Sequence, residues 1–146
     1  MISGNVQLIY PMFAMFCLTV VVLIKVFLSR VHAVKTGEVK AGYYKTYSIG
    51  TEPEAALKAS RHFSNLFEAP VLFYVACILG LILPVQGYTF LVLSWLYVFV
   101  RSAHAYIHIG PNKIPHRMFV YGLSWLTLAA MWILILIKAL AVSSTL

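Results

Sequence analysis

The feature that most constrains this chain is a series of four long apolar runs. They cover residues 6–29, 67–83, 88–107 and 118–142. A membrane-spanning α-helix needs about 20 mostly apolar residues, and a helix that is apolar on every face is not stable in water. Only 10% of the residues are charged, whereas a soluble domain has about a quarter. The sequence therefore predicts an all-α, polytopic membrane protein.

The second apolar run is too short to cross a bilayer alone, but residues 54–63 precede it without a helix breaker. We therefore expect a single domain of four transmembrane helices, at about residues 6–29, 54–83, 88–107 and 117–142. Pro70 lies inside the second predicted helix, where it removes a backbone hydrogen bond and favours a kink.

The connections between the runs differ in charge, which predicts an orientation. Six of the eleven Lys and Arg residues lie between Arg30 and Arg61. The third connection contains Lys113 and is flanked by Arg101 and Arg117, whereas the turn at 84–87 has no charge. Basic short loops stay on the cytoplasmic side. Both termini are thus predicted on the non-cytoplasmic side of the membrane.

The net charge of +7 does not indicate a nucleic-acid partner. A nucleic-acid site needs its cations on one solvated face, and here they lie in short segments between apolar runs. Membrane lipids are the expected surroundings.

The second predicted helix carries ionisable groups at membrane depth. Arg61, Asn65 and Glu68 are spaced i, i+4 and i+7, which places them on one helical face. Glu68 is the last carboxylate side chain in the sequence, and residues 69–146 contain none. A buried carboxylate without a partner would take up a proton, so a cationic side chain or a ligand ammonium is expected beside it. The alternative is a structural ion-pair network between helices.

The third helix has its own polar face, made by Arg101, His104 and His108. The two histidines have a spacing that suits two metal ligands, but no nearby carboxylate completes a shell, and no metal site is predicted. A haem site would need histidines that face each other, and His62 with His104 is the only loose pair. Neither interpretation is favoured.

Four arginines are expected at one level of the bundle, near its inner face: Arg30, Arg61, Arg101 and Arg117. Such cations repel one another unless anions lie between them, so the arrangement predicts a ligand with more than one negative group. For Arg117 the alternative is a simple anchor at the cytoplasmic surface.

The stretch from Arg61 through Asn65 to Glu68 resembles the R-x-x-x-N-x-x-E signature of the MAPEG family, the membrane-associated proteins in eicosanoid and glutathione metabolism. The passage from Arg101 to Arg117, which contains a proline, also resembles the segment between the third and fourth helices of that family. The helix number and the long basic first connection agree, so the resemblance covers nearly the whole chain.

The resemblance implies a homotrimer that binds glutathione between subunits near the cytosolic face and transfers it to a lipophilic substrate, or uses it as a peroxidase. Arg117 would then be catalytic, because a cation beside a thiol favours the thiolate. The candidate residues for binding glutathione follow from the same resemblance and from the faces described above: Arg30, Arg61, Asn65, Glu68, Arg101, His104 and His108.

Two other functions stay open. Catalytic family members commonly have an arginine before the asparagine, a tyrosine after the glutamate and a tyrosine on the third helix, where this chain has Ser64, Ala69 and His108. These differences favour a non-catalytic accessory subunit, or a scaffold that binds anionic lipid. A small transporter would use Glu68 for proton coupling, but such acids lie near the bilayer midplane.

Overall fold

A computed structural model of the chain describes residues 6–47, 50–83, 85 and 88–144, and these residues form helices and short connections. Four segments are long and apolar enough to cross a membrane, which confirms the predicted helical membrane fold. The elements are η1 (Val6–Leu8), α1 (Ile9–Lys35), α2 (Tyr43–Thr46), α3 (Glu54–Asn65), α4 (Ala69–Ile82), α5 (Tyr88–Ile109) and α6 (Ile114–Ser143).

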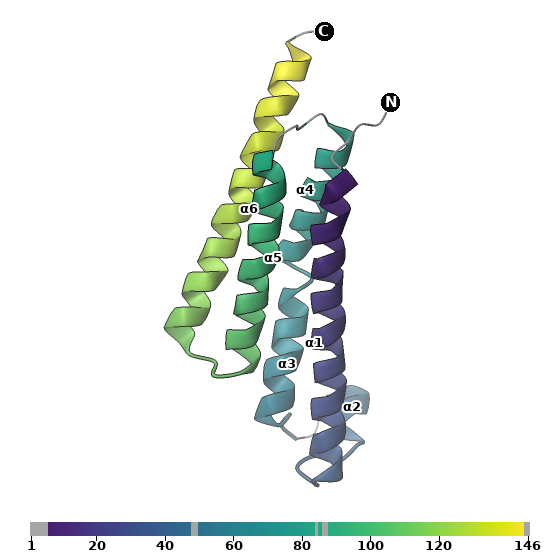
Figure 1. Cartoon of the computed structure of the whole chain (residues 1–146). Coiled ribbons are helices and arrows are strands. Elements are labelled where there is room, and N and C mark those ends of the chain that lie inside the picture. Colours follow the sequence, from purple (N-terminus) through teal and green to yellow (C-terminus); the bar gives the residue numbers. More distant parts are fainter. Residues whose placement is uncertain (1–5, 48–49, 84, 86–87, 145–146) are drawn as a thin grey trace.

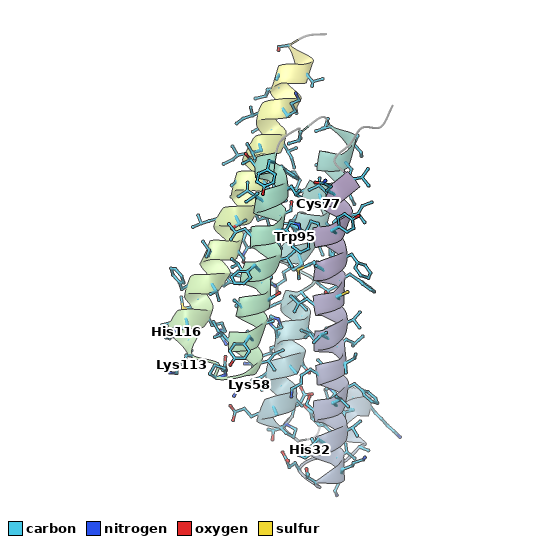
Figure 2. The ribbon with its side chains drawn as sticks, in the orientation of Figure 1. His32, Lys58, Cys77, Trp95, Lys113 and His116 are labelled. Atoms are coloured by element: carbon cyan, nitrogen blue, oxygen red, sulfur yellow. The ribbon has the colours of Figure 1, made fainter. Side chains whose placement is uncertain are left out.

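The long helices stand side by side with alternating direction, and α3 and α4 follow each other along one spanning segment (Figure 1). Helix α6 packs mainly on α5 and also contacts α4, while α1 packs on α3, α4 and α5. The start of α1 and the end of α6 lie at the same end of the bundle (Figure 1). We call the opposite end, which carries α2 and the α5–α6 connection, the basic end. Lys58, Lys113 and His116 lie toward it, in the half away from Cys77 (Figure 2).

The interior of the bundle is closely packed where α4 meets α5. The rings of Phe73 and Tyr97 are stacked with centroids 4.5 Å apart, and both side chains are fully buried. Gly80 faces Phe90 so closely that a Cβ atom at Gly80 would lie 2.7 Å from Cε1 of the ring. Many large apolar side chains point outward instead, as expected where lipid is the solvent.

The helix bounds differ from the predicted ones for local reasons. Helix α1 continues past residue 29 to Lys35, because no breaker precedes Gly37, which has a left-handed φ of 77°. Helix α6 begins at Ile114, with Pro115 in its first turn, a position that does not need a backbone N–H. The uncharged turn expected at 84–87 lies outside the described residues, apart from Val85.

The first connection is fastened to the helices at the basic end by Arg30. Its Nε atom lies 3.0 Å from Oε1 of Glu52, and its Nη2 donates a hydrogen bond of 2.9 Å to Oγ of Ser60. The guanidinium carbon also lies 5.1 Å from the ring centroid of Tyr44 and 5.5 Å from that of Tyr47. Arg30 therefore joins α1, the connection and α3.

Candidate functional site

The second spanning segment, Glu54–Ile82, is broken within its length. Helix α3 ends at Asn65 and α4 begins at Ala69. The amide of Leu66 donates to the carbonyl of Phe63 at 3.1 Å, a tightened bond typical of a helix end. Pro70 lies in the first turn of α4, where its missing N–H costs no intrahelical bond. The kink predicted at Pro70 is therefore a short unwound segment, Leu66–Glu68.

Arg101 of α5 supports this break from inside the bundle. Its side chain is fully buried, and its Nη2 donates a hydrogen bond of 2.9 Å to the carbonyl oxygen of Asn65. A helix C-terminus has carbonyl groups without intrahelical partners and carries partial negative charge. Arg101 thus supplies both a hydrogen-bond donor and a positive charge to the C-terminal end of α3. Its guanidinium carbon also lies 6.0 Å from the ring centroid of Tyr121 on α6.

Three histidines pack together beside Arg101, and we call His62, His104 and His108 the imidazole cluster. His62 comes from α3 and the other two from α5. The ring centroids are separated by 5.3 Å for His62 and His104, 5.1 Å for His62 and His108, and 5.6 Å for His104 and His108. All three side chains are buried. The sequence indicated the pair on α5 and the loose pair His62–His104, and the structure joins them in one cluster.

The three rings of the imidazole cluster pack against one another inside the bundle. Both ring nitrogens of His62 and the Nδ1 atoms of His104 and His108 lack a hydrogen-bond partner. Among the described residues, no three His, Cys, Asp or Glu side chains have an arrangement that could hold a metal ion.

Three of the four arginines expected at one level, Arg61, Arg101 and Arg117, lie near His108 of the imidazole cluster. The charges of Arg61, Arg101 and Arg117 all lie close enough to act on His108. Arg30 does not join them, because Glu52 and Ser60 bind its guanidinium at the outer part of the basic end. Of the four arginines on which the ligand prediction depended, three therefore lie near His108, and the guanidinium of Arg30 is bound by Glu52 and Ser60 instead.

Glu68 lies close to Arg61 of this group in the sequence but on the outer surface of the bundle. Its side chain is exposed, and among the described residues no cation lies within ion-pair distance of it. Its charge still acts on Arg101. The predicted face shared by Arg61 and Glu68 assumed one continuous helix, and the break at Leu66–Glu68 interrupts that periodicity. Arg61 is exposed as well.

Arg117 stands near the start of α6, at the basic end. Its Nη1 donates a hydrogen bond of 2.8 Å to Oδ1 of Asn112, which fixes one side of the guanidinium. Arginine has five N–H donors, so this bond leaves others for a ligand. Asn112 itself has a left-handed φ of 49°, a conformation that asparagine tolerates.

The model of the MAPEG family matches residues 8–137, which is nearly the whole chain. The chain is a member of the MAPEG family. No curated protein and no solved structure matches it significantly.

In this MAPEG protein the family signature spans the helix break. Arg61 and Asn65 lie on α3, whereas Glu68 is the residue before α4. Sequence analysis did not single out Tyr97, whose buried hydroxyl lacks a hydrogen-bond partner. Tyr97 precedes Arg101 by one helical turn, and this spacing on a polar face was the signal that could have identified it.

Proposed function

We propose that this MAPEG protein is a glutathione-dependent transferase or peroxidase that acts on lipophilic electrophiles arriving from the bilayer. The observation that carries the proposal is the pair of exposed, oppositely charged side chains Arg61 and Glu68 beside the break in a spanning segment. Neither forms an ion pair with another described residue. Charged groups at this depth are costly unless a partner meets them, and glutathione carries both a carboxylate and an ammonium group.

The proposed binding mode follows from these charges. Arg61 would bind a carboxylate of glutathione, Glu68 would accept hydrogen bonds from the ammonium group, and Asn65 would bind nearby. The positive charge of Arg101, on the interior side of the proposed site, would favour an anionic ligand. Its guanidinium is buried and makes one hydrogen bond among the described residues. His104 and His108 would form the inner wall of the site. Arg30 would hold the first connection, between α1 and α3, in place at the basic end.

Because Arg61 and Glu68 lie on the outer surface, we propose that a second copy of the chain closes the site in a homotrimer. A ligand between subunits removes both charged groups from lipid without rearranging the protomer. By the positive-inside rule the basic end would face the cytoplasm, where glutathione is available. Both termini would then lie on the non-cytoplasmic side. The membrane we propose is a bacterial inner membrane.

Arg117 is proposed as the catalytic residue. A cation beside the thiol lowers the thiol pKa and raises the fraction of thiolate, which is the nucleophile. In the transferase reaction the thiolate sulfur forms a bond to an electrophilic carbon of the substrate, and the leaving group takes the electron pair of the bond that breaks.

Glutathione titration of the detergent-purified protein tests the proposal by calorimetry and by the ultraviolet absorbance of the thiolate. The native protein should bind glutathione and show thiolate at neutral pH. Arg117→Ala should keep binding and lose the thiolate signal. Lys113→Ala, which removes an exposed cation from the α5–α6 connection just before α6, should change neither. Absence of binding heat in the native protein would refute the proposal.

A second candidate function is favoured by one observation. His108 occupies the position of a family tyrosine, and its ring is buried in the imidazole cluster, where it offers no hydroxyl to a substrate. A non-catalytic member that binds anionic lipid at the arginines would accept this change. Phospholipid retained by the purified protein, without glutathione binding and without thiol transfer, would support this function instead.

A further inference from the structure

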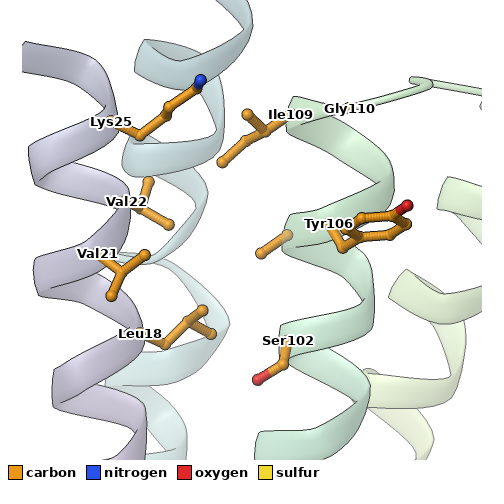
Figure 3. A pocket seen from close by; sticks show the side chains of 9 residues that line it. Leu18, Val21, Val22, Lys25, Ser102, Tyr106, Ile109 and Gly110 are labelled. Atoms are coloured by element: carbon orange, nitrogen blue, oxygen red, sulfur yellow. The ribbon is translucent and has the colours of Figure 1, made fainter. Parts of the chain in front are cut away.

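A groove of about 380 Å³ runs between α1 and α5, separate from the imidazole cluster. Its walls are almost entirely apolar, and Figure 3 shows Leu18, Val21 and Val22 on one side. Ser102 lies at one end, where its hydroxyl already donates to the carbonyl oxygen of Val98 at 2.8 Å. Lys25 lies at the other end, beside Ile109 (Figure 3). The groove therefore has a cationic end at Lys25 and an uncharged end at Ser102.

The direction of this groove agrees with that of the membrane. Ile109 is the last residue of α5, so Lys25 lies toward the basic end and Leu18 toward the middle of the bundle. Lys25 follows Leu18 by seven positions along α1, which corresponds to a rise of about 10 Å. One leaflet contributes about 15 Å of hydrocarbon, half of the bilayer core. The groove thus covers most of the depth of one leaflet, with its cation at the surface side.

The charge of Lys25 has no partner in the described part of the chain. Of the four carboxylates, Glu52 binds Arg30 and Glu54 binds Lys58, while Glu38 and Glu68 form no ion pair with Lys25 within the described residues. Lys25 is exposed and follows an apolar stretch of α1. A lysine in this setting extends its ammonium group toward the interface, where anionic headgroups lie.

We propose that the groove binds one anionic phospholipid, with an acyl chain between α1 and α5 and its phosphate on Lys25. The apolar walls suit a hydrocarbon chain, and the single cation at the surface end suits a negative headgroup. An amphiphile in the reverse direction would place its headgroup at Ser102, whose hydroxyl is already engaged. This proposal is independent of glutathione binding, because none of its residues belongs to the glutathione site proposed above.

Native mass spectrometry on the full-length protein tests the headgroup preference. The protein is offered phosphatidylglycerol and phosphatidylcholine with identical acyl chains. One lysine near an anionic headgroup contributes about 1 kcal/mol, so phosphatidylglycerol should be retained about fivefold better. Lys25→Met should abolish the preference and Lys25→Arg should keep it. Lys138→Met, which removes an intramembrane lysine from α6, should leave it unchanged. Equal preference in Lys25→Met and the native protein would overturn the proposal.

A second measurement locates the lipid and does not depend on the charge variants. Phosphatidylglycerol with a photoactivatable group in its acyl chain should label residues 18–22 of α1 and 102–109 of α5. Val21→Trp, which places a large ring on the groove wall, should reduce this labelling severalfold. Labelling confined to other helices would overturn the proposal. Disulfide-linked oligomers formed by Val21→Cys would do so too, because they would show that a second copy covers the groove.

Discussion

The substitution Glu68→Gln separates ligand binding from stability more cleanly than any other change in this protein. Glutamine keeps the size of the side chain and removes its charge. Because Glu68 is exposed and forms no ion pair with another described residue, the free energy of unfolding should change by no more than about 0.5 kcal/mol. The proposed ammonium partner belongs to the ligand, and the charge of Glu68 acts on Arg101 without forming an ion pair, so most of the effect should appear in binding.

The size of that effect follows from the interaction that is lost. A hydrogen bond between charged groups contributes about 1.5–3 kcal/mol, which corresponds to about 10- to 150-fold weaker glutathione binding. The substitution Glu54→Gln is the matched control, because Glu54 is an exposed glutamate on the same spanning segment whose partner is Lys58, four residues later. It should leave glutathione binding unchanged.

Calorimetry with two ligands gives the decisive assay. A glutathione analogue without the α-amino group should bind the native protein about as weakly as glutathione binds Glu68→Gln. The same analogue should show no further loss with Glu68→Gln, because the two changes remove the same interaction. Full additivity of the two losses would refute the pairing of Glu68 with the ammonium group. A large fall in the thermal midpoint of Glu68→Gln would refute the argument that this side chain has no structural partner.

The remaining predictions concern the fold. Gly80→Ala should destabilise the bundle by about 1–3 kcal/mol, because the Cβ atom of the alanine would lie 2.7 Å from the ring of Phe90. Thermal unfolding in detergent measures this change. Unchanged stability would contradict the close packing of α4 on α5. Arg30→Met should leave the carboxylate of Glu52, which is only 7% exposed, without its cation. Proteolysis of residues 36–51 should therefore become faster. Cleavage at the native rate would show that Arg30 does not fasten the connection. Burial, reinforced by Glu52, raises the pKa of Tyr44 above its ordinary value of 10.0. The contribution of Tyr44 to stability should thus be complete below pH 10.0 and lost as the pH rises through the raised pKa. Thermal midpoints measured at increasing alkaline pH test this, because Tyr44→Phe should lack the loss.

The helix number followed from the sequence because a bilayer imposes a length and an apolar composition on every spanning segment. The ends of the helices were harder to predict, since α1 leaves the membrane as a helix and stops only before Gly37. Pro70 indicated the place of the irregularity. It could not indicate an unwound segment, because the group that supports the end of α3 is Arg101, which is 36 residues away from Asn65.

The candidate site was predictable in its parts and less so in its arrangement. Helical spacing indicated Arg101, His104 and His108 on one face of α5, and the imidazole cluster includes both of these histidines. The position of Arg30 depends on Glu52, which reaches it through a connection without regular periodicity. No local pattern predicts such a contact, because the energy of the ion pair depends on the folded path of the connection.

The polar groups of this protein form two layers with different physical roles. The inner layer, Arg101 with the imidazole cluster, is completed by the chain itself. Lipid cannot solvate the carbonyl groups released by the break in the second span, and Arg101 satisfies one of them at Asn65. The outer layer, Arg61 and Glu68, has no ion-pair partner within the described residues. Variants of the inner layer should therefore change stability and binding together, because they alter the break that positions Glu68. Variants of the outer layer should change binding alone, so the ratio of the two effects distinguishes a ligand site from a structural ion-pair network.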